Sequence, residues 1–544
     1  MGKMSSPTVS TASPGPASAT PPAPAAPAGA ARVWRSPAFP AVLQAVALAV
    51  LVTMIAVGWG RAGLPGGGVA VPLLYTNLAA LGFWTLWLMG LILLLPVVGR
   101  LWCTVCPVGW CNEVASRAGA KADYPRRLQH LGFMAVLLFG FNAAAELWGL
   151  NRSPDATAKV LAIALAAAVL VGLAFRGRVF CRFWCPVGGM VALTSRLAPV
   201  EVAVRDGAVC RRCETKACFF GATRWYRFSW ASWHTVFAHK RPGCPAYLFP
   251  PEAAPGPHCL MCTGCIKNCP HGNVRWGWRP FASGLWPVAA RDRGEGLLVV
   301  VMTGLIFHRL ARFWSELRAV VEWPTEMLAA AVPTVPPLAL KGVNLFFGFV
   351  LWPLAFYLTL AVIARAAAQI SVTPWPAPGE EPAGLLYDVA EIDREQRGRE
   401  SGWAARRQGV WGYLAVYGYA FVPLIAGAYA AFALVKFNEK AGYLPLALGD
   451  PAGVKTSVAI NQLRILSGPE SLVALAAVRW GSVALAAAGL ALGLLAAGRI
   501  GARAYGEGTP AARRGAAVFR VGLLLLGSLL LLCLRAWLFR ASRG

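Results

Sequence analysis

The chain has 544 residues, of which 57% are hydrophobic and only 14% are charged. Soluble domains carry about 25% charged residues, so this composition excludes an ordinary soluble protein. Apolar runs of about 18 residues or more recur along the chain, each long enough to cross a bilayer. The net charge of +27 does not indicate nucleic-acid binding, because Lys and Arg are grouped in short segments between the apolar runs, as in the cytoplasmic loops of membrane proteins.

The first 189 residues predict a disordered tail followed by a four-helix membrane unit. Residues 1–35 are rich in Pro and Ala, which is typical of a disordered segment. Arg32 and Arg35 precede the first apolar run and place its N-terminus in the cytoplasm. The membrane unit, residues 36–189, contains apolar runs at about 41–58, 78–98, 131–149 and 158–175.

The second and fourth apolar runs end in the same motif. Residues 99–109 and 177–188 both read Gly-Arg, two apolar residues, Cys, a short gap and Cys-Pro-Val-Gly. Both copies follow even-numbered spans and are therefore expected on the same face of the membrane. Basic residues after the first copy indicate that this face is cytoplasmic: Arg117, Lys121, Arg126 and Arg127.

The repeated motif supplies four candidate redox-active or metal-binding residues, Cys103, Cys106, Cys181 and Cys185. Cysteine also packs as a small apolar residue, but two copies in one frame make packing alone a poor explanation. Two functional interpretations stay open. The pairs could exchange as dithiols, because nearby arginines favour thiolates. Alternatively, the four thiolates come together as a further iron or iron–sulfur site, with Cys111 as a spare ligand.

Residues 190–295 predict an inserted domain of ferredoxin type. The run from Cys259 to Pro270 has the spacing C-x2-C-x2-C-x3-C-P, which is the bacterial ligand pattern for a [4Fe–4S] cluster. The fourth Cys of such a run binds the neighbouring cluster. A zinc ribbon is the alternative, but it needs neither the third Cys nor the Cys-Pro ending. We therefore expect two clusters with crossed ligation: Cys210, Cys213, Cys218 and Cys269 hold one, and Cys259, Cys262, Cys265 and Cys244 hold the other.

Aromatic and basic residues alternate in residues 219–241 of this domain. This pattern suits the headgroup layer of a bilayer, so we expect the domain to lie against the membrane on its cytoplasmic side. Base stacking uses similar residues, but beside so many apolar runs no nucleic-acid partner is expected.

Residues 296–544 predict the C-terminal membrane helices. They include a charged, Pro-rich cytoplasmic loop at 365–408. His308, Arg309 and Arg312 interrupt the first apolar run, which makes it the weakest of the predicted spans. The runs lie near 296–314, 343–364, 410–435, 472–498 and 517–538, so the chain is expected to cross the membrane about nine times, within a range of eight to ten.

Three ionisable residues lie in or beside these spans. His130 and His308 are at different depths, so a haem bridged between them is not expected, and each is interpreted as an interfacial or packing residue. Arg479 lies inside an apolar run. It is a candidate for a quinone or partner-helix site, unless its side chain extends to the membrane surface.

Together, the repeated Cys-Pro motif and the ferredoxin runs resemble the NosR/NapH-type membrane polyferredoxins. The resemblance covers about residues 75–275 and rests on Cys181-x3-Cys185-Pro186 and on the run from Cys259 to Pro270. It implies an all-α polytopic protein of the bacterial inner membrane with an inserted two-cluster, ferredoxin-like α+β domain. The chain departs from the family in three ways. The first Cys pair is one residue shorter, no flavin-binding domain is expected, and the C-terminal helices have no counterpart.

The expected function is electron transfer as a component of an oxidoreductase system. The donor would be a quinol or a cytoplasmic carrier, and the acceptor a partner reductase or a metal ion. The expected cofactors are two [4Fe–4S] clusters, with the further iron site and a quinone as open additions. Membrane lipid and protein redox partners are the expected partners. The alternative is a redox-sensing transporter or a metalloenzyme maturation scaffold, in which the C-terminal helices move a substrate.

Overall fold

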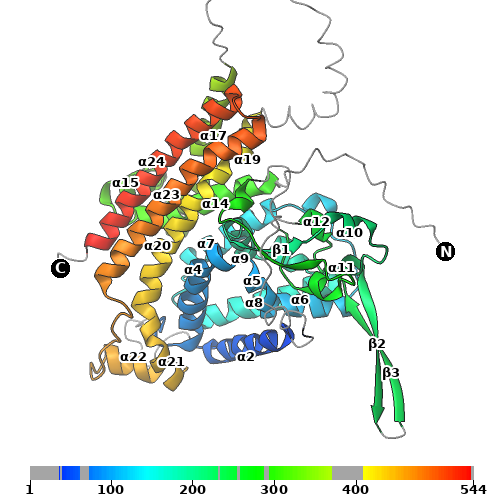
Figure 1. The fold of residues 1–544 in the computed structure, drawn as a ribbon. Helices are drawn as coiled ribbons and strands as arrows, with labels where there is room; N and C mark the ends of the chain where they lie inside the picture. The colour runs from blue at the N-terminus through cyan, green and yellow to red at the C-terminus, as the bar shows by residue number, and fades with distance from the viewer. Residues whose placement is uncertain are drawn as a thin grey trace, which may run out of the picture.

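The computed structural model describes residues 36, 39–61, 73–230, 233–253, 258–286, 293–369 and 409–540. Helices dominate this part of the chain, and two short antiparallel sheets accompany them (Figure 1). The predicted tail, residues 1–35, and most of the predicted loop 365–408 lie outside the described residues.

Within the described residues, eight helices are long and apolar enough to cross a membrane. A ninth apolar helix, Gly132–Leu147, has 16 residues and extends only about 24 Å, less than the roughly 30 Å of a bilayer core. This set agrees with the nine predicted runs and is compatible with a multi-pass membrane protein. The eight are Ala41–Gly58, Leu78–Val98, Pro154–Ala174, Gly294–Ala311, Pro337–Gln369, Val410–Gly449, Leu475–Tyr505 and Pro510–Phe539.

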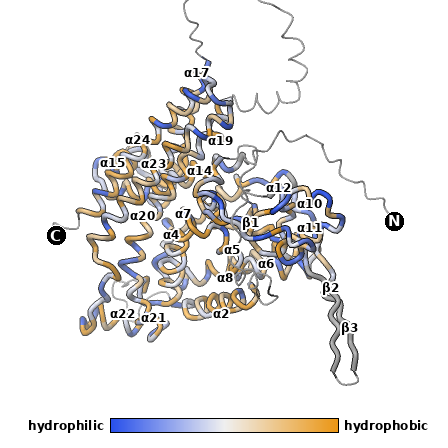
Figure 2. Tube along the Cα trace, in the orientation of Figure 1, coloured by the Kyte–Doolittle hydropathy of each residue, from blue (hydrophilic) through white to orange (hydrophobic). Residues whose placement is uncertain are grey.

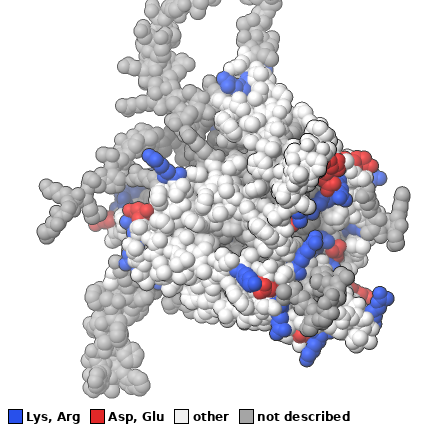
Figure 3. Space-filling model, turned by 180° about the vertical axis from the view of Figure 1, so that it is seen from behind, with Lys and Arg blue, Asp and Glu red and all other residues white. Residues whose placement is uncertain are grey.

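The surface agrees with a lipid-facing molecule. Figure 2 shows hydrophobic residues along the helices and hydrophilic residues gathered around α10 (Gly207–Arg212) and β1 (Val200–Val204). From behind, a broad area carries no charged side chain (Figure 3). Exposed apolar residues such as Val46 and Val50 on α2 (Ala41–Gly58) are ordinary for a helix in contact with lipid.

The N-terminal membrane unit begins with α2. A second long helix follows and is made of three consecutive parts: α3 (Leu78–Ala80), the π-helix η1 (Leu81–Trp87) and α4 (Leu88–Val98). After it come α7 (Gly132–Leu147) and α8 (Pro154–Ala174). Short helices lie between these spans and carry the repeated cysteines: α5 (Leu101–Val105), α6 (Pro107–Ala118), η3 (Phe180–Trp184) and α9 (Pro186–Thr194).

The weakest predicted span proves to be the most enclosed helix of the C-terminal unit. In α14 (Arg293–Ala311), 89% of the apolar stretch Gly294–Ala311 is buried. The interrupting residues His308 and Arg309 fall in its last turn, so the apolar stretch before them is continuous. The unit also contains α16 (Pro337–Phe346), η5 (Phe347–Leu351), α17 (Trp352–Gln369), α19 (Val410–Tyr417), η6 (Gly418–Phe421), α20 (Val422–Lys440), α23 (Leu475–Tyr505) and α24 (Pro510–Arg540).

Three helices of the C-terminal unit lie between the predicted spans. These are α15 (Ser315–Ala331), α21 (Leu444–Gly449) and α22 (Val454–Asn461). α15 presents an exposed apolar stripe at Val320, Trp323 and Met327. A window search for long apolar runs overlooks such a helix, because charged residues on its other face lower the mean hydropathy.

The inserted domain is closed by pairing of its first and last strands. β1 lies antiparallel to β4 (Val274–Trp278), with Val200 opposite Trp278. Between them lie α10, α11 (Ala217–Phe220), the hairpin of β2 (Gly221–Trp230) and β3 (Trp233–Pro242), α12 (Pro250–Ala253) and α13 (Gly264–Asn268). The hairpin projects away from the helices (Figure 1). Most side chains of the predicted interfacial stretch 219–241 lie outside the described residues.

Candidate metal centres

The repeated motif has the same backbone path in both copies. Gly99 and Gly177 open the copies with φ of 56° and 75°, a left-handed conformation that favours glycine. An arginine that is only 3% exposed follows each glycine. The second cysteine of each copy, Cys106 or Cys185, then caps a helix that has Pro in its first turn. The sequence repeat is therefore also a structural repeat.

The extra residue of the second copy is absorbed by a π-helix. Cys103 lies on the α-helix α5, whereas Cys181 lies on the π-helix η3. A π turn holds one more residue than an α turn, and such insertions are frequent at functional sites. The one-residue difference between the spacings Cys103-x2-Cys106 and Cys181-x3-Cys185 is therefore accommodated within one helical turn. Both second cysteines still reach the start of the following helix.

The structure brings the four cysteines of the repeat together. The Cys181 thiol lies 3.0 Å from the position that a Cβ on Gly109 would take, so the second copy packs directly on the first. The arginine of each copy also forms a hydrogen bond with the other copy. An Arg100 Nη donates to the carbonyl of Gly188 at 3.3 Å, and an Arg178 Nη donates to the carbonyl of Cys103 at 3.2 Å. This exchange is the arrangement expected of a pseudo-twofold.

The four cysteines of this group are half-buried, and their thiols lie within electrostatic reach of one another. Burial raises the pKa of Cys103, Cys106 and Cys181, and it raises that of Cys185 to about 12. Neighbouring thiols of the group add to the rise for Cys103, Cys181 and Cys185. Such thiols remain protonated near neutral pH unless a metal draws off the proton, because coordination deprotonates a thiol. The donor set therefore fits a metal site better than reactive dithiols.

Backbone N–H groups point at the second cysteine of each copy. Gly188 N–H donates to Cys185 Sγ at 3.2 Å, and the N–H groups of Val108 and Gly109 act on Cys106. Hydrogen bonds to sulfur favour added negative charge and raise the reduction potential of a bound cluster. We call Cys103, Cys106, Cys181 and Cys185 the membrane-side group.

A second group consists of Cys244, Cys259, Cys262 and Cys265, which we call the inner group. Cys244, Cys259 and Cys265 line one cavity. Burial is the main cause that raises the pKa of Cys259 and Cys265 and brings that of Cys262 to about 12, and Cys244 adds to each rise. Cys244 therefore lies with the three cysteines of the later run, as the crossed assignment expects.

The third group consists of Cys210, Cys213, Cys218 and Cys269, which we call the outer group. All four line a second cavity. Asn273 joins two of them, because its backbone N–H donates to Cys269 Sγ at 3.2 Å and its Nδ2 donates to Cys210 Sγ at 3.1 Å. Cys269 thus lies with the upstream cysteines. Sequence reasoning gave no signal for Asn273, four residues beyond the last cysteine of the run.

The outer group lies in a more polar setting than the other two. A hydrogen bond with Thr215 is the largest cause that lowers the pKa of Cys213. Burial raises the pKa of Cys218 to about 11, and it also raises the pKa of Cys210. In the described part of the chain, no three His, Cys, Asp or Glu side chains are spaced to hold a single metal ion.

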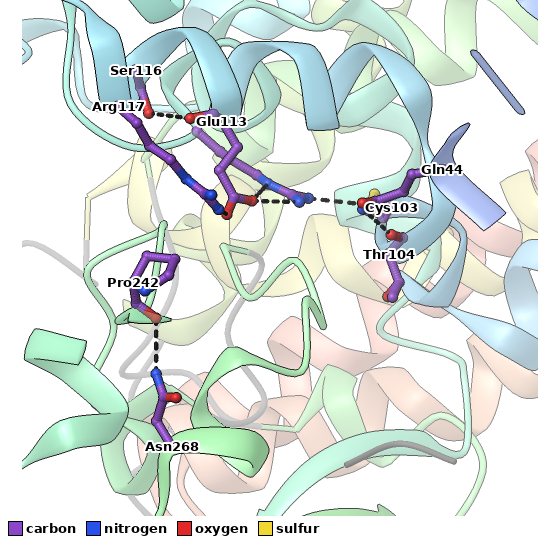
Figure 4. Close-up of polar contacts among 9 residues, drawn as sticks. Gln44, Cys103, Thr104, Glu113, Ser116, Arg117, Pro242 and Asn268 are labelled. Atoms are coloured by element: carbon purple, nitrogen blue, oxygen red, sulfur yellow. Dashed lines mark hydrogen bonds and ion pairs between the residues drawn. The ribbon is translucent and has the colours of Figure 1, made fainter. Parts of the chain in front are cut away.

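Direct contacts connect the membrane-side group to the inner group. Thr104, next to Cys103, donates its hydroxyl hydrogen to the carbonyl of Met261 at 2.8 Å. Gln44 of α2 donates to the Thr104 carbonyl at 2.7 Å, so the first span supports this contact (Figure 4). Asn268 donates to the carbonyl of Pro242 at 2.8 Å and so holds α13 to the end of the hairpin (Figure 4).

A buried ion pair borders the same region. Arg178 binds Glu113 at 2.6 Å, and Glu113 also binds Arg117 at 2.6 Å. Burial pushes the pKa of Glu113 upward, but Arg178 and Arg117 outweigh it and hold that pKa below the ordinary value. Arg178 acts electrostatically on Cys181 and on Cys262, one from each group. It therefore lies between the membrane-side and inner groups.

Similarity to known families falls on the membrane-side group. A family model described as a 4Fe-4S binding domain matches residues 80–125 and 159–201, the segments that contain the two copies of the motif. This match supports an iron–sulfur protein. No curated protein and no solved structure matches the chain significantly. Together with the apolar helices, the match suggests iron–sulfur electron transfer at a membrane.

The other candidates from the sequence lie apart from these groups or have structural roles. His308 is buried against Phe349, with ring centroids 5.0 Å apart, whereas His130 is exposed. Arg479 lies in the first turns of α23 and stacks over Phe539 at 5.6 Å, so it belongs to a helix end rather than to the middle of a span. Cys111 lies close enough to Cys106 for that thiol to contribute to the rise of its pKa, after burial.

Proposed function

We propose that the protein transfers electrons in a bacterial inner membrane through three iron–sulfur sites in series. The observation that carries the proposal is the arrangement of twelve cysteines in three adjoining groups of four. The membrane-side group contacts the inner group through Thr104 and Met261. The inner and outer groups share α13, because Cys265 belongs to one and Cys269, just after the helix, belongs to the other.

The residues of the chain supply position and electrostatics. A [4Fe–4S] cluster accepts and returns one electron, and its potential follows burial, nearby charge and hydrogen bonds to sulfur. Asn273 and the N–H groups at Gly188 and Gly109 provide such hydrogen bonds. Two [4Fe–4S] clusters occupy the inner and outer groups with crossed ligation, and a further iron–sulfur site occupies the membrane-side group.

The electron path runs between the bilayer and the inserted domain. A quinol in the bilayer would exchange electrons at the membrane-side group, and a protein redox partner would do so at the outer group. The positive-inside distribution of Arg and Lys favours a cytoplasmic position for the inserted domain. A reporter inserted between Trp230 and Trp233, the last paired residues of the hairpin, should score as cytoplasmic. A periplasmic score there would reverse the orientation.

The test of this function is a set of cysteine variants in the full-length protein purified without oxygen. Iron and acid-labile sulfide analysis with EPR should show three sites in the unchanged protein. Changing Cys106 to Ser, Cys185 to Ser, or both should stop electron exchange between the quinol pool and the remaining sites to a similar degree, because the four thiolates act as one unit. The inner and outer sites should still assemble. Unchanged rates in all three variants would return these cysteines to a packing role.

A further inference from the structure

Two arginines beside the membrane-side and inner groups, the buried Arg100 and the half-buried Arg182, have no carboxylate partner among the described residues. Arg100 is 3% exposed, and its only hydrogen bond among the described residues goes to the carbonyl of Gly188. Arg182 lies between Cys181 and Cys185 on η3, and its Nε is buried without a hydrogen-bond partner, as is the Nε of Arg100. Within the described residues, no Asp or Glu forms an ion pair with either arginine.

The two guanidinium groups also repel each other. Arg182 lies near enough to Arg100 that its pKa falls to about 10, mainly through burial and further through the Arg100 charge. Removing a charge from water is unfavourable unless an opposite charge lies close by, so two like charges side by side in a largely enclosed region are unfavourable in the protein alone. The arrangement requires an anion.

Three neighbouring arginines in this fold each form an ion pair with a carboxylate. Arg178 has Glu113 at 2.6 Å, and Arg196 has Glu295 at 2.8 Å. Arg279, which lines the same cavity as Arg100, has Glu201 at 3.6 Å. Each of these three cations has its own carboxylate. Arg100 and Arg182 are surrounded by thiols instead.

The thiols around the two arginines belong to the membrane-side and inner groups. Arg100 opposes the effect of burial on the pKa of Cys103, Cys185 and Cys259. It also lines the cavity of Cys244, Cys259 and Cys265. Cys244 acts on Arg182 in turn. No comparable pair of arginines lines the cavity of the outer group, where Lys216 is the cation among the described residues.

We infer that Arg100 and Arg182 are the counter-charges of the anionic iron–sulfur sites in the membrane-side and inner groups, and that they raise the reduction potentials of these two sites. This inference rests on the proposed function. Four thiolates give a bound cluster a net negative charge, and accepting one electron adds another unit of it. The two arginines stabilise that added charge, so they favour the inward transfer, toward the membrane, of an electron delivered by a one-electron donor at the outer group.

The test is an EPR-monitored titration of the full-length protein, purified without oxygen, with dithionite as reductant. Arg100→Gln and Arg182→Gln should each lower the midpoint potentials of the inner and membrane-side sites, and leave that of the outer site unchanged. A tenfold loss in the equilibrium constant for electron transfer from the outer to the inner site corresponds to 59 mV for a one-electron couple. Arg100→Lys should retain most of the wild-type potential. The outer signal is identified by its loss in Cys213→Ala.

A matched control is Arg176→Gln, which removes an exposed guanidinium paired with Asp123. Equal shifts in this control and in Arg100→Gln, or no shift in the two Gln variants with full iron content, would overturn the inference. Loss of iron in both Gln variants with retention in Arg100→Lys would support it, since the charge alone is then required. Loss in the Lys variant as well would indicate a steric role and overturn it. Wild-type protein without iron and sulfide would refute the proposed function itself.

Discussion

At the residue scale, Asn273 contacts one cysteine from each of the two cysteine runs. It donates hydrogen bonds to Cys269, from the later run, and to Cys210, from the earlier one. The spacing of the cysteines alone predicts that the fourth Cys leaves its own run. It could not predict the asparagine that holds the two sulfurs side by side, because their contact depends on how β4 follows α13. The sequence places Arg100 and Arg182 beside the cysteines of the repeat, but only the structure shows that neither forms an ion pair with a described carboxylate.

Removing the Cys269 thiol tests the crossed ligation. In Cys269→Ala the outer site should lose its EPR signal, because that thiol lines the cavity of Cys210, Cys213 and Cys218. The inner site should remain, since Cys244 completes it. The measurement is iron content and EPR of dithionite-reduced protein. Loss of the inner signal with retention of the outer one would show that each run binds its own cluster.

At the element scale, the two copies of the motif differ by one residue, which changes the type of one helical turn. The sequence predicts the repeat and the shared glycine, but it does not show that the extra residue in the second copy is taken up by a π-helix. The spans themselves were predictable, since length and hydropathy depend on local sequence. The pairing of β1 with β4, about 75 residues apart, was not, because a short strand does not specify its partner.

The left-handed glycine of the second copy provides a test at this scale. In Gly177→Ala the new Cβ would lie 2.4 Å from the carbonyl oxygen of Pro245, at a φ of 75°. The left-handed conformation alone costs about 1–2 kcal/mol, so the melting temperature should fall and iron should be lost from the membrane-side site. The control is Gly140→Ala in α7, where nothing lies within 4 Å of the new Cβ. Equal stability of the two variants would contradict the requirement for glycine at position 177.

At the scale of the whole molecule, a buried ion pair connects the iron–sulfur half to the C-terminal helices. Arg196 precedes β1, and Glu295 lies in the first turn of α14. Their side chains are 2% and 1% exposed, and Arg196 also lies 4.9 Å from the ring centroid of Tyr419 in η6. The alternative function, a redox-sensing transporter, would need such a connection. The structure offers the contact, and the C-terminal helices carry one cysteine, the buried Cys533.

Breaking this pair should destabilise the protein strongly. Glu295→Gln leaves the Arg196 charge buried with less compensation, and the loss of one partner of a buried pair typically costs about 3–5 kcal/mol. Replacing both residues, with Arg196→Met and Glu295→Leu, should cost less than the single change. Glu322→Gln, in an exposed pair with Arg318, is the control and should cost below about 1 kcal/mol. Thermal unfolding in detergent measures the stability of all three variants. A Glu295→Gln variant as stable as the control would show that the Arg196–Glu295 pair does not stabilise the protein.

Under the proposed crossed ligation, the order of the cysteines in the chain also sets the order in which the sites become complete during synthesis. All four thiols of the membrane-side group have been synthesised once the ribosome passes Cys185. The inner group must wait for Cys265 although Cys244 was made earlier, and the outer group must wait for Cys269 although Cys218 was made long before. The two ferredoxin-type sites thus become complete within four residues of each other. A nascent chain halted between Cys265 and Cys269 has a complete inner group, but it still carries three thiols of the outer group without their fourth partner: Cys210, Cys213 and Cys218.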